Sequence, residues 1–284
     1  MSLDPSKARS ERPSREGLTE YLVSEIMSNR LTPTTRLPPE RRLAEEFKLS
    51  RPIVREVLRG LQERGLVEIV AGKGTFVQAP SPAGGARSLD LHYRRSDATA
   101  RDVVDARRMV EAQTARRSAL HATEADIEAL ERCLSQAESG GNIVDRARSD
   151  ITFHGLLARA SANPVIETIF ASIAGLTFEM MLVSLADPDV ERLGLPYHRR
   201  IVEAVRARDP GRAEAAMIAH LELAESMYGD DYDRSIDSLA RRGLGRYLEP
   251  SISLDTLVDE AVAGLRDDFG PDGAGVSSVK SDVG

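Results

Sequence analysis

The feature that most constrains this chain is a pair of short helical segments, joined by a tight turn and followed at once by a glycine-tipped hairpin. Residues 40–47 and 51–64 carry apolar side chains at helical spacing. The second segment has an i, i+3, i+4, i+7 stripe that must face a core: Val54, Val57, Leu58 and Leu61. Residues 66–70 and 75–77 have strand composition, and Ala71-Gly72-Lys73-Gly74 between them is a turn. This order predicts a helix-turn-helix with a β-hairpin wing.

Three arginines recur every four residues on a different face of the second segment: Arg51, Arg55 and Arg59. Such a row usually marks only a solvated helix face. Here the segment follows a tight turn, begins after a residue suited to N-capping, Ser50, and precedes a hairpin with Lys73 at its tip. The combination favours DNA binding by the second helix, with Lys73 in reach of a groove or phosphates.

The charge distribution is uneven along the chain. The formal net charge of −7 argues, taken alone, against a nucleic-acid-binding protein. Residues 1–79, however, hold 14 basic and 11 acidic side chains, whereas residues 80–228 carry a net charge of −4 and residues 229–284 one of −6. The composition is thus compatible with a mildly basic DNA-binding module attached to an acidic remainder.

The composition, the helix-start signals and the breaks between helical segments predict a mainly α protein that divides into five regions. Aromatic residues make up only 4% of the chain and Trp is absent, which favours packed helices over a β-sandwich. Thr123 and Asp209-Pro210 have the form of helix starts. We expect a disordered N-terminus at 1–14, a winged helix-turn-helix domain at 15–79, a linker at 80–98, an all-helical domain at 99–228 and an acidic, partly disordered tail at 229–284 with one helix at 254–266.

The sequence also bears on the compartment. No run of eighteen apolar residues is present, and the first fifteen residues are polar, so neither a membrane span nor a signal peptide is expected. The single cysteine, Cys133, cannot form an intramolecular disulfide and is expected to be a packed, structural thiol. These features predict a cytoplasmic protein.

One aspartate and three of the five histidines form a candidate metal site. Asp150 and His154 are four residues apart and so project from one helix face. His198 and His220 each lie eleven residues from Asp209, so an antiparallel helical hairpin turning there would bring both imidazoles to one level. One carboxylate and three imidazoles suit Zn, with Ni or Mn as alternatives. Spacing alone leaves open that the histidines are structural.

The N-terminal motifs resemble, in order and spacing, the winged helix-turn-helix of GntR-family transcription regulators. The matching motifs are Leu37-Pro38-Pro39-Glu40-Arg41-Arg42-Leu43-Ala44, Ser50-Arg51, Val54-Arg55-Glu56-Val57-Leu58, Gly65-Leu66-Val67 and Gly72-Lys73-Gly74-Thr75-Phe76-Val77. The resemblance covers about residues 15–79. It implies that the DNA contacts come from Arg41, Ser50, Arg51, Arg55, Gly72 and Lys73. A bidentate arginine–guanine pair is the expected base readout, and the wing tip is expected to enter the minor groove.

Two prolines depart from the family pattern. Pro39 stands where a serine is frequent, which removes a hydroxyl that could cap the next helix. Pro52 follows Arg51 directly, where many members have a hydroxyl residue first and the proline second. One donor to a phosphate is thereby lost at the start of the recognition helix.

The C-terminal motifs resemble the FCD effector domain of the FadR subfamily over about residues 99–228. They are Arg107-Arg108-Met109-Val110-Glu111, Asp150-Ile151-Thr152-Phe153-His154, Tyr197-His198-Arg199-Arg200-Ile201 and Ala219-His220-Leu221. The resemblance implies that Asp150, His154, His198 and His220 bind a divalent metal beneath a pocket for a small carboxylate effector. Arg107 is a candidate second anchor for that carboxylate; the alternative is a salt bridge with Asp105 or Glu111.

Together these features predict a ligand-responsive transcriptional regulator, expected to be a repressor that binds a palindromic operator as a homodimer and responds to a small organic acid. It is not expected to be an enzyme. Two other readings remain open: a metal-dependent hydrolase, because such a metal can activate water, and a direct metal sensor.

Overall fold

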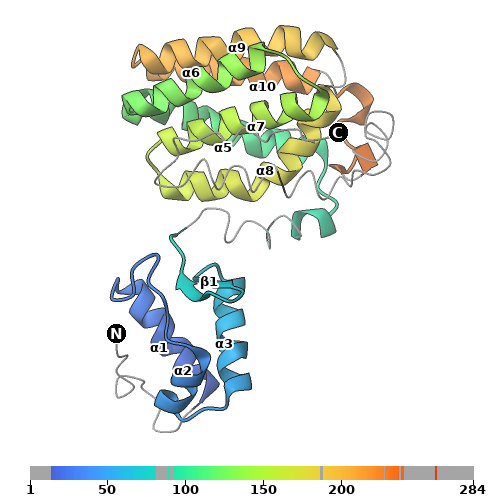
Figure 1. Cartoon of the computed structure of the whole chain (residues 1–284). Coiled ribbons are helices and arrows are strands. Elements are labelled where there is room, and N and C mark those ends of the chain that lie inside the picture. Colours follow the sequence, from blue (N-terminus) through green and yellow to red (C-terminus); the bar gives the residue numbers. More distant parts are fainter. Residues whose placement is uncertain are drawn as a thin grey trace, which may run out of the picture. The chain divides into compact units, whose positions relative to one another are not determined.

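The structure, a computed structural model, describes residues 14–80, 89, 92–185, 188–226, 228–236, 238, 239 and 260 (Figure 1). It divides into two compact units, Met1–Gly85 and Ala86–Gly284. The helix expected at 254–266 and the end of the chain lie outside the described residues, apart from Glu260.

Over residues 14–80, the N-terminal unit has three helices and a small wing. Its elements are α1 (Arg15–Met27), α2 (Glu40–Phe47), α3 (Arg51–Glu63), β1 (Val67–Val70) and β2 (Gly74–Val77). The strands pair antiparallel, with Val67 opposite Val77 and Val70 opposite Gly74. All three helices and both strands contribute to one apolar core: Leu18, Leu22, Leu43, Val54, Leu58, Leu61, Val67 and Val77 are among its members. The predicted winged helix-turn-helix is confirmed.

The turns of this unit depend on residues that tolerate a left-handed backbone. Lys48, the predicted turn residue, ends α2 with φ of 53°. At the wing tip Gly72 has φ of 72° and Gly74 has φ of 119°, a region that glycine adopts without the strain a Cβ causes. The hairpin is closed by a hydrogen bond of 3.0 Å from the Lys73 N–H to the Val70 carbonyl. Lys73 therefore stands at the tip, as expected.

Ser50 occupies the N-cap position of α3, but its hydroxyl makes no capping hydrogen bond. The prediction that Ser50 caps the helix was correct in position and wrong in the bond. A capping side chain normally accepts from the N–H of the second or third helical residue. The second residue here is Pro52, which has no N–H, and the third is Ile53, whose N–H the Ser50 side chain does not accept. The Ser50 side chain is exposed, so its hydroxyl faces solvent.

The C-terminal unit is all-helical within the described residues. It comprises α5 (Ala100–His121), α6 (Glu124–Glu138), α7 (Ile143–Ala160), α8 (Pro164–Ser184), α9 (Pro188–Arg206), α10 (Pro210–Ser226) and a short 3-10 helix, η2 (Gly229–Asp231). In Figure 1, α6, α9 and α10 lie on one side of the bundle, α8 on the other, and α5 and α7 between them. The all-α prediction for this part is confirmed.

Local sequence accounts for the helix starts. Thr99, Thr123 and Asn142 each form a capping box with the aspartate three residues later. Asn163 accepts from the N–H groups of Val165 and Ile166, and Pro164 takes the first helical position. The predicted starts at Thr123 and at Pro210 are both found.

Helix α8 is long and apolar enough, by length and composition, to cross a membrane, although no uninterrupted apolar run signals it. Of its most apolar window, 72% is buried inside the domain. Phe170, Phe178 and Leu182 from α8 belong to one buried apolar cluster with Ile151 of α7. This is the burial pattern of a core helix in a folded domain.

Candidate functional site

The residues expected to contact DNA all lie at the surface of the N-terminal unit. Arg51 and Arg55 lie on the first two turns of α3, with 63% and 51% of their side chains exposed. The Arg41 side chain on α2 is 80% exposed. Gly72 and Lys73 are exposed at the wing tip. The second helix of the motif and the wing thus offer solvent-accessible cations.

Glu40 joins the two helices of the motif, a role that spacing did not suggest. Its carboxylate accepts two hydrogen bonds from Arg55, Nε to Oε1 at 3.0 Å and Nη2 to Oε2 at 2.8 Å. Arg51 Nη2 lies 4.0 Å from the same carboxylate. The hydrogen bond from Arg55 lowers the pKa of Glu40. Such an exposed pair adds little stability, but it fixes where the Arg55 guanidinium points.

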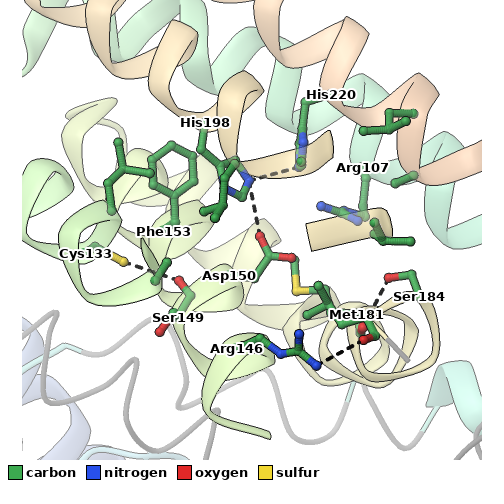
Figure 2. A pocket seen from close by; sticks show the side chains of 18 of the residues that line it. Arg107, Cys133, Arg146, Ser149, Asp150, Phe153, Met181, Ser184, His198 and His220 are labelled. Atoms are coloured by element: carbon green, nitrogen blue, oxygen red, sulfur yellow. Dashed lines mark hydrogen bonds and ion pairs between the residues drawn. The ribbon is translucent and has the colours of Figure 1, made fainter. Parts of the chain in front are cut away.

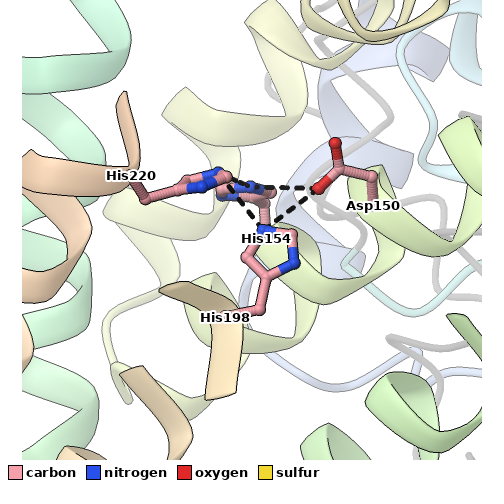
Figure 3. Close-up of side chains that lie close together, drawn as sticks. All are labelled: Asp150, His154, His198 and His220. Carbon is pink, nitrogen blue, oxygen red and sulfur yellow. Dashed lines mark hydrogen bonds and ion pairs between the residues drawn. The ribbon is translucent and has the colours of Figure 1, made fainter. Parts of the chain in front are cut away.

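The four expected metal ligands converge on one point in the C-terminal unit (Figure 3). His198 Nε2 lies 3.2 Å from His220 Nε2 and 3.2 Å from Asp150 Oδ1. His154 Nε2 lies 3.3 Å from His220 Nε2 and 3.5 Å from Asp150 Oδ1. All four donor atoms lie within 4.8 Å of one another. Helix α7 supplies Asp150 and His154, while α9 and α10 supply one histidine each.

These residues fit a divalent metal by separation and by donor chemistry. Donors bound to one ion at about 2.0–2.2 Å come to lie about 3.0–3.5 Å apart at neighbouring positions, close to the separations found. Three imidazole nitrogens point at one another, so their lone pairs oppose unless a cation or a proton lies between them. Asp150 Oδ1 is buried and accepts no hydrogen bond from the described residues. A cation would satisfy this oxygen.

The protonation states of two imidazoles and of the carboxylate also favour metal binding. Burial lowers the pKa of His198 to about 4 and lowers that of His220 well below its ordinary value. Both imidazoles are therefore neutral at pH 7, the form that ligates metals. Burial alone would lower the pKa of His154 as well, but Glu111 and Asp150 raise it overall. Burial alone would raise the pKa of Asp150, but its contact with His154 and the other imidazoles lowers it overall, so the carboxylate is ionised.

Glu111 orients His154 by contacting Nδ1, the ring nitrogen that is not directed at the other ligands. Its carboxylate pairs with His154 Nδ1, while its other oxygen accepts from Arg107 Nε at 2.6 Å. Arg107 and Glu111 are both 2% exposed. Burial alone would raise the pKa of Glu111, but Arg107 and His154 hold it at about 2. A carboxylate on the far nitrogen of a ligating histidine fixes the tautomer and increases the basicity of the ligating nitrogen.

Arg107 was predicted either to anchor an effector carboxylate or to form a salt bridge with Asp105 or Glu111. The structure shows the salt bridge with Glu111. Asp105 instead lies 4.0 Å from Arg108. Arg107 also lines the cavity described next, so the pairing with Glu111 does not remove it from the site. The role of Glu111 behind His154 was missed because the sequence does not show which residues of α5 face α7.

A cavity opens directly beside the four ligands (Figure 2). Asp150, His198 and His220 line it together with Arg107. Its solvent-accessible volume is about 60 Å³, room for a few water molecules or for a molecule of about four to six heavy atoms. Much of the rest of the lining is apolar, including Leu134, Phe153, Met181, Leu185 and Leu223.

Cys133 lies in the wall of this cavity. Its buried thiol donates to the Ser149 carbonyl at 3.3 Å. It packs in the same core cluster as Leu130 and Leu134. This is the structural environment expected for it.

A winged helix-turn-helix followed by a helical domain with an internal cavity is the architecture of a transcriptional regulator. Two family profiles match: "Bacterial regulatory proteins, gntR family" over residues 15–77 and "FCD domain" over residues 102–223. This chain belongs to the GntR family, in its FadR-like branch with an FCD domain. GntR-family regulators bind DNA operators.

Several known proteins are similar to this chain. The HTH-type transcriptional regulator LutR of Bacillus subtilis is 30% identical over 74% of this chain and 99% of its own length. The Glc operon transcriptional activator and the transcriptional repressor NanR of Escherichia coli K12 are each 28% identical, over 77% and 78% of this chain and 90% and 88% of their own lengths. The solved structure of Streptococcus agalactiae GntR shares the fold, with a TM-score of 0.60 and 23% identity over 75% of this chain and 99% of that one.

These relatives are transcriptional regulators by name, and the family membership confirms the prediction that this chain is a transcriptional regulator. One of them is an activator and another a repressor. The direction of regulation is therefore not fixed by the family.

The pairing of Glu111 with His154 leads to a testable expectation. Glu111→Gln should weaken zinc affinity about 10- to 100-fold, because a neutral amide makes the imidazole a poorer ligand. Competition with a chromogenic chelator measures this, with circular dichroism confirming the fold. Glu214→Gln is the matched control, since Glu214 pairs with Arg116 outside the cluster. If Glu111→Gln binds zinc as tightly as wild type does, Glu111 has no role in the metal site.

Proposed function

We propose that this regulator binds a divalent metal through Asp150, His154, His198 and His220 and uses it to bind a small carboxylate effector. The observation that carries the proposal is the opening of a cavity onto three of the four converging ligands, lined also by Arg107. Zinc suits the donor set best, with nickel or manganese as alternatives. When bound, such a metal supplies a Lewis-acidic position for a carboxylate oxygen.

The residues of the cavity support an anionic ligand of small size. Its described lining holds one carboxylate, Asp150, against Arg107, Arg146 and two imidazoles. Arg107 is kept charged and held in position by Glu111, and it offers further guanidinium N–H groups for a bidentate contact with a carboxylate. The volume of about 60 Å³ fits an acid of two or three carbons. A small organic acid is therefore the proposed effector class.

The DNA-binding surface is proposed to use Arg41, Ser50, Arg51, Arg55, Gly72 and Lys73. In this account Arg51 and Arg55 reach base edges or phosphates in the major groove. A homodimer would place two such units on the halves of a palindromic operator. We propose a cytoplasmic repressor with its DNA-binding domain at 15–79, a linker at 80–98 and its effector domain at 99–228. The effector then favours one arrangement of the two DNA-binding units over another.

Isothermal titration of zinc-loaded protein with acetate, glycolate and lactate tests this function. The proposal expects saturable binding of at least one acid, lost when zinc is removed, with no product formed. Release of a product over time would show an enzyme. Operator binding that responds to zinc alone, with no acid bound, would show a direct metal sensor. Either result would contradict the proposal.

A smaller effect is expected at the wing. Lys73→Ala should weaken binding about equally on all DNA sequences and reduce the slope of log affinity against log salt by about 1 for each DNA-binding unit, since one phosphate contact is lost. Arg206→Ala is the control, because it removes one positive charge from an exposed pair with Glu131 in the other unit. Fluorescence anisotropy at several salt concentrations measures both. An unchanged slope in Lys73→Ala would show that the wing tip does not contact phosphate.

A further inference from the structure

After α10 the chain folds back and packs on the helical domain. We use the name strap for the described residues 228–236, 238 and 239, which include η2. The strap lies beyond residue 223, where the match to the FCD domain ends. It follows directly on α10, which carries the metal-site residue His220.

One end of the strap forms part of the cavity wall. Tyr228 is only 6% exposed and lines the cavity together with Arg107, His220 and Ala224. Its hydroxyl donates to the carbonyl of Met180 at 3.1 Å, which pins the ring against α8. Burial raises the pKa of Tyr228 to about 12, so the phenol stays neutral.

The other end of the strap caps the start of α5. The N–H groups of Ala100 and Arg101 donate to the carbonyls of Arg234 and Tyr232 at 3.0 and 2.9 Å. The first N–H groups of a helix have no acceptor within the helix, so the strap satisfies two of them. The Ile236 N–H in turn donates to the carbonyl of Ala98 at 3.0 Å.

Side chains reinforce this attachment. Arg101 makes two hydrogen bonds to Asp233, at 2.6 and 3.2 Å, and its guanidinium lies 4.4 Å from the centre of the Tyr232 ring. Ile236 and Leu239 are 2% and 4% exposed. They belong to one apolar cluster with Tyr228 and with Val103, Val104, Leu176 and Met180.

The same cluster receives the chain that arrives from the N-terminal unit. Tyr93 and Ala98 pack against it. Arg94 Nη2 lies 2.5 Å from Glu179 Oε1 on α8, and Glu179 is only 1% exposed. The strap therefore contacts the cavity through Tyr228 and the end of the interdomain connection through Ile236.

We propose that the strap completes the small-molecule site, with Tyr228 as a ligand-contacting wall residue, and that it connects occupancy of the site to the chain at residues 98–101. The inference rests on the proposed function for the identity of the ligand. A molecule that fills the cavity presses on the Tyr228 ring, and the ring is continuous with the segment that caps α5. The binding site thus extends beyond residue 223, where the match to the FCD domain ends.

The test uses the full-length, zinc-loaded protein with acetate, glycolate and lactate as probes. Tyr228→Ala should weaken the tightest-binding acid about tenfold or more, since it removes one wall of the cavity, while Tyr228→Phe keeps the ring and stays within about threefold of wild type. Zinc affinity should stay near wild type in both. Equal acid affinity in Tyr228→Ala and wild type would overturn the proposal.

Hydrogen exchange provides a second readout, at the end of the strap that caps α5. In wild type, acid binding should slow amide exchange at Ala100 and Arg101. Ile236→Ala should speed that exchange about tenfold and abolish the response to acid, whereas the control Ile169→Ala, on the exposed face of α8, should do neither. An unchanged response in Ile236→Ala would contradict the connection, even if Tyr228→Ala fails to fold.

The two proposals can fail separately. If none of the acids binds wild-type protein, the effector class is wrong, and zinc alone becomes the probe. Zinc should then slow exchange at Ala100 and Arg101 in wild type but not in Ile236→Ala. The same response to zinc in both proteins, or none in wild type, would overturn the strap proposal.

Discussion

Replacing His198 with alanine is expected to abolish tight zinc binding and the part of the thermal stability that depends on it. An ion that binds only the folded state stabilises it by about 4 kcal/mol when free zinc is about 1,000-fold above the dissociation constant. For a domain of this size that corresponds to about 8–16 °C in Tm. His198→Ala should lose most of this difference between zinc-loaded and zinc-free protein. Elemental analysis and calorimetry measure the two quantities.

Zinc-loaded and zinc-free forms of each protein must be compared, because the His198 side chain also contributes to the packing of the domain. Its ring centre lies 4.3 Å from that of Phe153, so some stability is lost for reasons unrelated to metal. His121→Ala is the matched control, since His121 is exposed at the end of α5 and outside the cluster. One zinc per chain, bound by His198→Ala as tightly as by wild type, would refute the metal site.

Replacing Arg51 or Arg55 with alanine is expected to weaken operator binding by about 1–3 kcal/mol for each DNA-binding unit, with relaxed specificity at the base that is read. In a dimer both units lose the contact, so the total loss is about twice as large. The operator is first obtained by selection from random duplexes. Anisotropy on the selected duplex and on a scrambled one then separates specific from non-specific binding.

Arg30→Ala is the control for that experiment. It removes the same charge from the same unit, but Arg30 is held by Glu25 at the end of α1 and lies outside the recognition helix. Wild-type affinity in Arg51→Ala and Arg55→Ala on the selected operator would show that these arginines do not read it. A loss that is equal on both duplexes would assign them to phosphates instead.

Much of the fold is predictable because its signals are local. Helix α2 was predicted with its observed bounds, since Pro39 precedes it and the Lys48 turn ends it. The Thr123 capping box fixes the start of α6 in the same way. The missing capping bond at Ser50 was not anticipated, because Pro52 removes only one of the two usual donors and leaves the N–H of Ile53.

Part of the site was predictable from spacing. His198 and His220 stand at equal distances from the turn at Asp209, and the structure brings their Nε2 atoms to 3.2 Å. The partners of these residues were not predictable to the same degree. Glu40 meets Arg55 fifteen residues away, and Glu111 meets His154 through the packing of α5 on α7. Which faces of two helices meet is decided by the packing of the whole domain.

The acidic tail was also predictable only in part from the sequence. Its composition predicted an acidic, partly disordered segment, of which Ile236 and Leu239 are buried in one cluster with Tyr228 and the start of α5. A few apolar side chains spaced among acidic ones do not form a recognisable helical stripe. Their partners lie on α8, at Leu176 and Met180, and around the start of α5, which lies more than a hundred residues earlier in the chain, so only the folded domain reveals the contact.

The central claim is that a small carboxylate, bound through the metal site, changes the affinity of this regulator for its operator. The most direct measurement is the anisotropy of a labelled, selected operator with zinc-loaded protein during titration with acetate, glycolate and lactate. The account predicts that one acid shifts the operator dissociation constant about fivefold or more in wild type, within the usual range of allosteric coupling, and has no effect in His198→Ala. The same shift in both proteins, or no shift with any of the acids in zinc-loaded wild type, would contradict it.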